Sequence, residues 1–471
     1  MAEVAHDLSE RERVEMLVTR SRAAMRVFAD ADQTRVDETV TALAWAIYKP
    51  EHARELAEMA VRETGMGNVV DKITKNQRKT FGALRDLMRA KTVGVIEELP
   101  DLGLVKYAKP VGVVAAITPS TNPSATAVNK SMMAVKGKNA IIVAPSPSGL
   151  ETCTRTVELL REGLETIGEP ADLVQVLPGP ATKSLTAILM ESCDLAVATG
   201  SQDNVRAAYR SGTPAVGVGA GNVPVIIDET ADLGAAAEKI CASKTFDNAT
   251  SCSSENSLII LDEVYDEAIQ ALQAIGGYLA DAEEKDLIEE KHWVDGRINR
   301  NVLGKDAAVL ARAVGLSEAA GQSKFFLVEE SGTGPDHPFS DEKLSLVLTV
   351  YRVSDFTEAI AKVRAILDFK GRGHSCGIHT ANMDHAHQLA KELDVVRVLV
   401  NMAHTFGNGG GFDSGLNFTL SMGCGTWQGN SISENLSYQH FINVTHLAAP
   451  IPEDKPSEAA LFSKHWERYG K

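Results

Sequence analysis

One cysteine in this chain stands among side chains that suit a nucleophile. Cys252 lies in the segment Thr-Phe-Asp-Asn-Ala-Thr-Ser-Cys-Ser-Ser-Glu-Asn at 245–256, where the thiol is surrounded by hydroxyls and amides rather than by an apolar run. A thiolate in such a place can attack an aldehyde carbonyl to form a thiohemiacetal, which becomes a thioester when it loses hydride. A structural, buried cysteine is the commoner state of a lone cysteine and is the alternative. The role of Cys252 therefore depends on what the other segments supply.

The remaining cysteines indicate neither a disulfide framework nor a metal site. The sequence contains no C-x-x-C pair and no Cys/His spacing of the zinc type, so we expect no metal. A chain whose cysteines form neither disulfides nor metal sites suits a reducing compartment, and such a compartment also keeps a nucleophilic thiol reduced. Cys424 is best interpreted as structural. The other cysteines are at positions 153, 193, 241 and 376.

Composition indicates an acidic globular protein. Of the 471 residues, 44% are hydrophobic, which is enough for two or three domains with large cores. The formal net charge of -16 disfavours nucleic acid and anionic membranes as partners. No run of about 18 apolar residues occurs, and the first 11 residues lack the apolar core of a signal peptide. We therefore expect a cytoplasmic protein.

The hydrophobic pattern changes near residue 111 from helical to alternating strands and helices. Apolar residues recur at helical spacing over 14–28 and 36–47, and another helical segment runs from 51 to near Gly65. Short β-branched runs then predict βαβ units and parallel sheets covered on both faces, with a second α/β block after Cys252. The composition of 407–415 predicts a flexible loop. The predicted strands are 111–117, 140–144, 173–177, 195–198, 223–228, 257–261, 344–350 and 396–400.

Three turns rich in small polar residues follow predicted strands, at 117–126, 145–149 and 198–201. Ligands of open parallel sheets bind at the carboxyl ends of the strands, where hydroxyls, amides and backbone N–H groups can hold phosphates or an oxyanion. The first turn could equally be an ordinary helix N-cap. The third turn lacks the G-x-G-x-x-G pattern, which argues against an ordinary Rossmann dehydrogenase. Since 145–149 contains no Asp or Glu to repel a 2′-phosphate, NADP is possible and weakly favoured.

The glycine-rich segment Gly-Val-Gly-Ala-Gly-Asn at 217–222 bears on the fate of a thioester. It contains no carboxylate or other plausible general base. The glycines could also serve a turn with a left-handed backbone, and this structural role is compatible with the lack of a base in the segment. Without a base to activate water, a thioester on Cys252 should persist until another thiol attacks it.

Together these segments resemble the coenzyme A-dependent, acylating branch of the aldehyde dehydrogenase superfamily, over residues from about 14 to 446. The resemblance implies an α/β fold of the aldehyde dehydrogenase type, with two Rossmann-like lobes and an oligomerisation element. It implies NADP or NAD as cofactor, and a small aldehyde and coenzyme A as substrates. The segments that carry it are 245–255, 117–126, Glu-Lys-Leu-Ser-Leu-Val-Leu at 342–348, Gly-Arg-Gly-His-Ser-Cys-Gly at 371–377, Ser-Met-Gly-Cys-Gly-Thr-Trp at 421–427 and Asn-Ser-Ile-Ser-Glu-Asn-Leu at 430–436.

The resemblance also implies roles for individual residues. Cys252 would be the nucleophile, and Asn122 with the backbone N–H of Cys252 would bind the oxyanion. His374 would either take a proton from incoming coenzyme A or merely orient a loop. Glu342 would hold the nicotinamide ribose, although Leu346 stands where the family commonly has proline. The other implied cofactor contacts are Thr118, Ser120, Thr121, Asn122, Ser146, Gly200, Ser201 and Gly219.

In hydrolytic members of the superfamily, the segment that matches 217–222 resembles Glu-Leu-Gly-Gly-Lys, and its glutamate activates the water that cleaves the thioester. The lack of that glutamate implies acyl transfer to coenzyme A instead. A hydrolytic enzyme with its base elsewhere, a glutamyl-phosphate-type reductase and a non-catalytic scaffold remain alternatives.

The C-terminal third most resembles the members of the branch that convert sulfoacetaldehyde to sulfoacetyl-CoA. Enzymes for succinate semialdehyde and acetaldehyde are close rivals. An anionic substrate tail would need a cation or several donors, for which Arg397, His404 and Thr405 are candidates. A strand arginine could equally face an internal ion pair.

The resemblance divides the chain into a cofactor-binding domain at 1–235, a catalytic domain at 236–429 and a C-terminal oligomerisation and return segment at 430–471. Residues 98–114 would contribute to oligomerisation. A homodimer or a homotetramer is expected.

Overall fold

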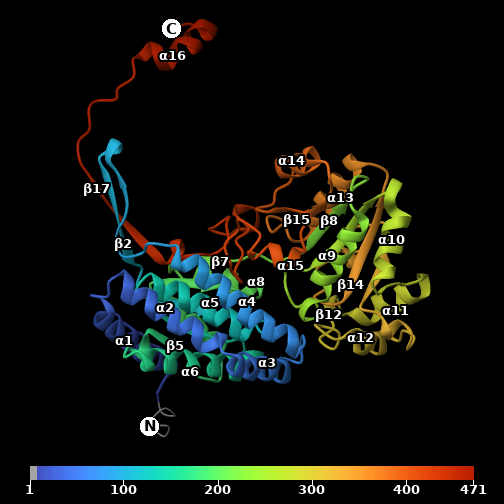
Figure 1. The fold of residues 1–471 in the computed structure, drawn as a ribbon, viewed down its shortest axis with the longest axis horizontal. Coiled ribbons are helices and arrows are strands. Elements are labelled where there is room, and N and C mark those ends of the chain that lie inside the picture. Colours follow the sequence, from blue (N-terminus) through green and yellow to red (C-terminus); the bar gives the residue numbers. More distant parts are fainter. Residues whose placement is uncertain (1–7) are drawn as a thin grey trace.

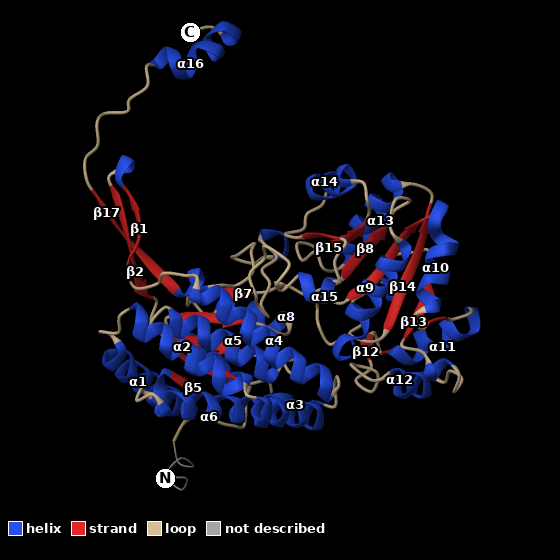
Figure 2. Cartoon of the chain, in the orientation of Figure 1, coloured by secondary structure: helices blue, strands red, loops and turns tan. Residues whose placement is uncertain are grey.

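Two parallel sheets organise the chain, one in each of two α/β lobes (Figure 1). The computed structural model describes residues 8–471. Residues 1–7, on which the expectation about a signal peptide partly rests, lie outside the described residues. Figure 2 shows loops and turns gathered between the two lobes.

The first lobe contains a 5-stranded parallel sheet in the order β5-β4-β3-β6-β7. All residues of β3, β4 and β6 are buried, as expected for strands covered on both faces. Helices α2, α5 and α6 cover one face of this sheet, and α1, α7 and α8 cover the other. The strands are β3 (Val113–Ile117), β4 (Ala140–Ala144), β5 (Val174–Val176), β6 (Leu195–Ala198) and β7 (Ala215–Gly217). The helices are α1 (Glu10–Phe28), α2 (Gln33–Tyr48), α3 (Pro50–Thr64), α4 (Val69–Met88), α5 (Pro123–Lys136), α6 (Leu150–Thr166), α7 (Lys183–Ser192) and α8 (Gln202–Arg210).

The second lobe contains a 7-stranded parallel sheet in the order β10-β13-β14-β9-β8-β15-β16. Helices α9 to α12 pack on one side of it, and α13 and α14 pack on the other. The strands are β8 (Val223–Ile227), β9 (Glu255–Leu261), β10 (Gly277–Leu279), β13 (Phe325–Glu329), β14 (Val347–Val353), β15 (Cys376–His379) and β16 (Val398–Val400), with a separate hairpin of β11 (Trp293–Val294) and β12 (Arg297–Ile298). The helices are α9 (Leu233–Thr245), α10 (Tyr265–Ala274), α11 (Ala282–His292), α12 (Ala307–Val314), α13 (Phe356–Phe369), α14 (Met383–Glu392) and α15 (His404–Gly407).

A 3-stranded antiparallel sheet forms an arm that projects from the first lobe (Figure 1). It is built from β1 (Gly94–Leu99), β2 (Leu104–Pro110) and β17 (Ile442–Ala448), and the chain continues through 449–457 to the exposed helix α16 (Glu458–Tyr469). The predicted element at 98–114 differs from this arm, because Val113 and Val114 lie buried in β3. The predicted domain boundary at 235/236 stays a prediction.

The strands predicted at 140–144 and 195–198 coincide with β4 and β6, and the other predicted strands are found with shifted ends. The largest shift is at β14, which begins at Val347 rather than at 344. Leu344 has a left-handed backbone with φ 44°, and the hydroxyl of Ser345 accepts a hydrogen bond from Val347 N, so neither residue extends the strand. The segment at 407–415, predicted to be a flexible loop, is buried from Gly407 to Gly411.

No helix among residues 8–471 combines the length and the apolar content needed to cross a bilayer.

The C-terminal segment returns to the first lobe after the second lobe is complete. Phe418, Ile432, Leu436 and Phe441 all belong to the core of the first lobe. Phe418 is fully buried and lies against Gly82 of α4, where a Cβ would overlap its ring. This contact fixes the position of the loop before Phe418 relative to α4.

A Gly82→Ala variant tests this contact. The added methyl group would overlap the ring of Phe418, so we expect the free energy of unfolding to fall by about 1–3 kcal/mol. Urea denaturation followed by circular dichroism measures the change. The control is Gly234→Ala in α9, where the new Cβ meets only Asp232 at 3.6 Å and stability should stay equal or rise. Equal midpoints for Gly82→Ala and the wild type would contradict the predicted overlap.

Candidate active site

The candidate residues gather where edges of the two sheets meet. Three loops of the first lobe follow the carboxyl ends of β3, β4 and β6. In the second lobe, the loops before β8, β9, β14 and β15 share one edge because these strands are parallel and belong to one sheet. Cys252 is in the loop before β9. The strand order of the first sheet changes direction between β3 and β6, which is where open α/β sheets bind ligands.

Cys252 follows a tightly wound turn and touches the glycine-rich loop. Asp247, Asn248 and Ala249 all have positive φ, which turns the chain sharply before the thiol. Gly221 packs so closely on the backbone of Cys252 that a Cβ there would overlap it. The N–H of Cys252 makes no hydrogen bond within residues 8–471, so it remains available to a bound oxyanion.

The thiol of Cys252 is neutral at physiological pH in this arrangement. Burial raises its pKa to about 12, and the nearby carboxylate of Glu342 acts in the same direction. Burial also raises the pKa of Glu342 to about 7. A positive charge brought beside the thiol would therefore be needed to favour the thiolate.

A buried ion cluster positions Asn122 beside this loop. The carboxylate of Asp247 pairs with Lys72 at 3.0 Å and also with Lys75. Lys75 Nζ donates to Asn122 Oδ1 at 2.8 Å and to Thr250 Oγ1 at 3.3 Å, so it joins the two lobes. Since its oxygen is held by Lys75, Asn122 directs only its amide N–H groups to other partners. The one signal for this cluster in the sequence is the spacing of Lys72 and Lys75, which on a helix also suits a solvated face.

His374 is fully buried, and one of its ring nitrogens lacks a partner. Its Nδ1 lies 2.8 Å from the hydroxyl of Ser375, whereas Nε2 makes no hydrogen bond within residues 8–471. Burial lowers the pKa of His374 well below its usual value, with the charge of Arg397 as a second cause. The imidazole is therefore neutral and can accept a proton at Nε2.

The residues predicted to bind a substrate tail have partners within the protein. The guanidinium of Arg397 donates to Asn435 Oδ1 and to the carbonyl oxygens of His374 and Gly423, at 2.8–3.0 Å. His404 is buried, with Nδ1 2.9 Å from the carbonyl oxygen of Ser253. The geometry of Arg397 and His404 thus favours a framework role.

Thr405 differs from the other two because it lines a small cavity beside Cys252. Its hydroxyl nevertheless donates to the carbonyl oxygen of Ser243 at 3.2 Å. Ser251 and Ser253, which flank the thiol, and Asn122 line the same cavity. The cavity, of about 30 Å³, is thus lined by the two residues on either side of Cys252.

The loops predicted to contact the dinucleotide touch one another, but one of the predicted residues is buried and already has a hydrogen-bond partner. Gly200 lies against Pro119, which brings the loops after β3 and β6 into contact. Ser201 caps the N-terminus of α8, and Ser120 and Thr121 are partly exposed just before α5. Thr118 is the exception, since it is buried and its hydroxyl donates to the carbonyl oxygen of Ala144 at 3.3 Å.

The arrangement fits a dinucleotide through its helix termini. Asn122 forms no side-chain cap on α5, and Pro123 occupies the first turn, so the N-terminus of α5 is open at the loop after β3. Helix N-termini attract phosphate through their free N–H groups. Ser146 is partly exposed at the neighbouring turn, and Gly219 packs against Gln428 and Cys424.

A carboxylate missed in the sequence reaches the turn after β4. Glu63 of α3 accepts hydrogen bonds from Glu151 N at 2.8 Å and from Thr152 N at 2.9 Å, and so caps the N-terminus of α6. The weak preference for NADP rested on the lack of a carboxylate at 145–149. Glu63 supplies one from a distant part of the chain, at the first turn of α6 just after 145–149.

A group of possible metal ligands lies outside this site. Asp228, Glu229 and His385 bring their ligand atoms within 4.8 Å of one another, but Asp228 already accepts hydrogen bonds from Thr230 and pairs with His385. This group lies just beyond β8, at the edge of the sheet opposite to Cys252.

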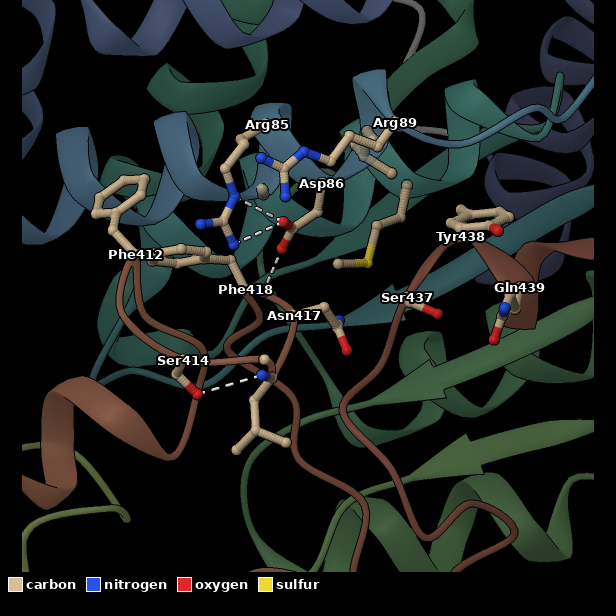
Figure 3. A pocket seen from close by; sticks show the side chains of 15 residues that line it. Arg85, Asp86, Arg89, Phe412, Ser414, Asn417, Phe418, Ser437, Tyr438 and Gln439 are labelled. Carbon is tan, nitrogen blue, oxygen red and sulfur yellow. Dashed lines mark hydrogen bonds and ion pairs between the residues drawn. The ribbon is translucent and has the colours of Figure 1, made fainter. Parts of the chain in front are cut away.

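A second pocket, of about 410 Å³, lies at the C-terminal end of α4 (Figure 3). It is lined by Arg85, Asp86 and Arg89 together with loops around Phe412 and Tyr438. Asp86 pairs with Arg85 and accepts a hydrogen bond from Phe418 N at 2.6 Å, so these charges hold the loop to the helix.

Comparisons with known proteins agree with the expected fold. A family model described as "Aldehyde dehydrogenase family" matches residues 2–276. The chain is 52% identical to the sulfoacetaldehyde dehydrogenase (acylating) of Cupriavidus necator, over 98% of this chain and 94% of that protein. It is 38% identical to the succinate-semialdehyde dehydrogenase (acetylating) of Clostridium kluyveri, over 92% and 95% respectively. The crystal structure of an acetylating aldehyde dehydrogenase from Geobacillus thermoglucosidasius matches with a TM-score of 0.91 at 34% identity, over 95% of this chain and 98% of that chain.

The raised pKa of Cys252 predicts how alkylation of the thiol depends on pH. With a pKa near 12, the thiolate fraction at pH 7 is on the order of 10⁻⁵, and it rises about tenfold for each pH unit. The rate of iodoacetamide labelling, followed by mass spectrometry of the peptide, should therefore increase steadily from pH 6 to 10 without cofactor. The Cys252→Ala variant controls for the other cysteines, all of which are buried. A plateau below pH 8 would mean that the thiol is already ionised.

Proposed function

This chain belongs to the aldehyde dehydrogenase family, and we propose that it is a coenzyme A-acylating member that oxidises sulfoacetaldehyde to sulfoacetyl-CoA with NAD(P). The observation that carries the reaction type is a cysteine packed against a glycine-rich loop without a base. Gly221 touches the backbone of Cys252, and no residue of 217–222 is a carboxylate. The thioester is therefore kept from hydrolysis by this loop and passes to a second thiol.

Cys252 attacks the aldehyde carbon and forms the C–S bond of a thiohemiacetal. The negative charge that develops on the aldehyde oxygen is stabilised by the amide of Asn122 and by the N–H of Cys252. An oxidised nicotinamide held by the loops after β3, β4 and β6 would supply the acceptor for the hydride and its two electrons, and its positive charge would favour the thiolate of Cys252. The product on the protein is a thioester at Cys252.

The thiol of coenzyme A then attacks the thioester, and Cys252 leaves as thiolate. We assign the proton of the coenzyme A thiol to His374, whose neutral ring has an unpartnered Nε2. Its lowered pKa makes it a weak acceptor that passes the proton on rather than keeping it. The alternative, in which His374 only orients the loop at 371–377, also agrees with the hydrogen bond from Arg397 to its carbonyl oxygen.

The loops after β3, β4 and β6 are proposed to hold the dinucleotide, with Ser120, Thr121, Ser146, Gly200 and Ser201 along it. Glu342 lies near Cys252, as a ligand of the nicotinamide ribose should. Gly219 is proposed as a further contact of the dinucleotide, because it belongs to the same glycine-rich segment as Gly221, which packs on Cys252. Because Glu63 caps α6 beside the turn after β4, NAD is the expected preference.

Similarity supports sulfoacetaldehyde over succinate semialdehyde as the substrate. The relative named for sulfoacetaldehyde is 52% identical, and the one named for succinate semialdehyde is 38% identical. Six free cysteines support a reducing, cytoplasmic setting.

Product analysis with a panel of aldehydes tests this function. Sulfoacetaldehyde, NAD and coenzyme A should give NADH and sulfoacetyl-CoA in equal amounts, faster than with NADP or with acetaldehyde. Cys252→Ser should lower turnover by at least about 1,000-fold, and Cys193→Ser, at the buried end of α7, should not. Repeated turnover to free acid without coenzyme A would indicate a hydrolytic enzyme, and a requirement for phosphate would indicate a reductase of the glutamyl-phosphate type.

The arm is proposed to join copies of the chain into a homodimer or homotetramer. Strand β17 lies at the edge of its sheet and pairs with β2 on one side only. Val444 and Leu447 on this strand are 40% and 50% exposed. An open edge with apolar side chains is suited to pairing with another chain.

A Val444→Lys/Leu447→Lys variant should therefore shift the mass in solution to that of a monomer, as measured by light scattering after size-exclusion chromatography. Lysine on an edge strand opposes further pairing through its charge and solvation. The matched control is Val27→Lys, another exposed apolar residue, located on α1. An unchanged mass of the double variant would exclude this edge as the interface.

A further inference from the structure

We propose that Lys79 binds the anionic end of the aldehyde substrate and so selects for a charged substrate. The proposal rests on the proposed function, because it requires the carbonyl carbon to react at Cys252. It names a residue that differs from the candidates suggested by the sequence.

Lys79 belongs to a row of lysines on one face of α4. Lys72, Lys75 and Lys79 are three and four residues apart, so their side chains lie on the same side of the helix. The first two share the carboxylate of Asp247. Lys79 Nζ donates to the carbonyl oxygen of Gly409 at 2.8 Å, and no carboxylate of residues 8–471 lies within 4.0 Å of it. Two of the three donors of this ammonium group are therefore left over.

The side chain of Lys79 lines the small cavity beside Cys252. Lys75, Asn122 and the two serines that flank the thiol line the same cavity, and no Asp or Glu does. A substrate whose carbonyl group lies at Cys252 would thus extend toward a cation. In a chain with a net charge of -16, an anion needs such a local cation to overcome the general field.

The other polar groups of the cavity are already engaged. The hydroxyls of Thr405, Thr419 and Ser253 donate to Ser243 O, Ser421 O and Met422 Sδ respectively. Ser251 Oγ accepts a hydrogen bond from Ser253 N, which leaves its proton free. Lys79, with Ser251 beside the thiol, is thus the source of donors for a sulfonate or carboxylate.

The neighbouring cations are less suitable. The guanidinium of Arg397 is held by carbonyl oxygens of the protein, and Lys75 is neutralised by Asp247. Arg85 pairs with Asp86 in the separate pocket of Figure 3, which Arg89 also lines. Burial lowers the pKa of Lys79 to about 7, with the charges of Arg78 and Lys75 as lesser causes. A bound anion would favour the protonated form.

The test compares two substrates in matched variants of the full-length protein. Lys79→Met removes the charge and keeps the length of the side chain. Its kcat/KM for sulfoacetaldehyde should fall by about 10- to 100-fold, mainly through a higher KM. The loss of one hydrogen bond to a charged group weakens binding by about this factor. The kcat/KM for propanal should change less than about 3-fold. Lys79→Arg should retain most of the selectivity, and Arg89→Met, which removes an exposed charge just after the end of the same helix, should behave like the wild type.

Equal losses on both substrates would show that Lys79 only supports the fold, and no loss on sulfoacetaldehyde would show that another group binds the anion. Either result overturns the proposal for Lys79. The proposed function stands in both cases, provided that the wild type shows coenzyme A-dependent turnover. If Lys79→Met does not fold, as judged by circular dichroism, Lys79→Gln takes its place with the same expected ratio. If the wild type itself has no coenzyme A-dependent activity, the proposed function fails instead.

Discussion

A carboxylate shared by two buried lysines holds the loop that carries Cys252 to the first lobe. Asp247 is fully buried, and Lys72 and Lys75 are each 5% exposed. Although burial alone would raise its pKa, the two ammonium groups keep the pKa of Asp247 below its usual value, so the carboxylate is charged. Removing one partner of a buried ion pair costs about 3–5 kcal/mol, since it leaves an uncompensated charge. The same lysines also bind Thr121 O and Asn122 Oδ1, so the geometry around the thiol depends on this cluster.

The two sheets contribute different parts of the chemistry because opposite edges of them meet. Carboxyl ends of strands in the first lobe offer helix termini that suit phosphates. The amino edge of the second sheet offers the thiol, the glycine-rich loop, Glu342 and His374. Burial holds the thiol and His374 in their neutral forms and raises the pKa of Glu342 to about 7. A ligand that supplies a compensating charge would favour the thiolate, and without it Cys252 stays in the less reactive thiol form.

The sequence predicted what depends on local pattern. Runs of β-branched residues predicted the strands, and the parallel α/β arrangement then placed polar turns at strand ends. The comparisons confirm the fold and the family resemblance, whereas the individual roles of the site residues remain proposals. What the sequence could not predict depends on distant pairs. Glu63 and Glu151 are 88 positions apart, and a lysine row on a helix such as Lys72 and Lys75 is ordinarily solvated. The role of Arg397 likewise depends on partners at 423 and 435 that only the fold brings to it.

The return of the chain to the first lobe has a consequence for biosynthesis. Phe418, Ile432, Leu436 and Phe441 complete the core of a lobe whose other residues precede position 217. The core of the second lobe uses residues between 223 and 395. On the ribosome, the lobe that is made first is therefore finished last, after its later neighbour can already fold. Until residue 441 emerges, the nascent first lobe exposes the apolar surface that these four side chains will cover.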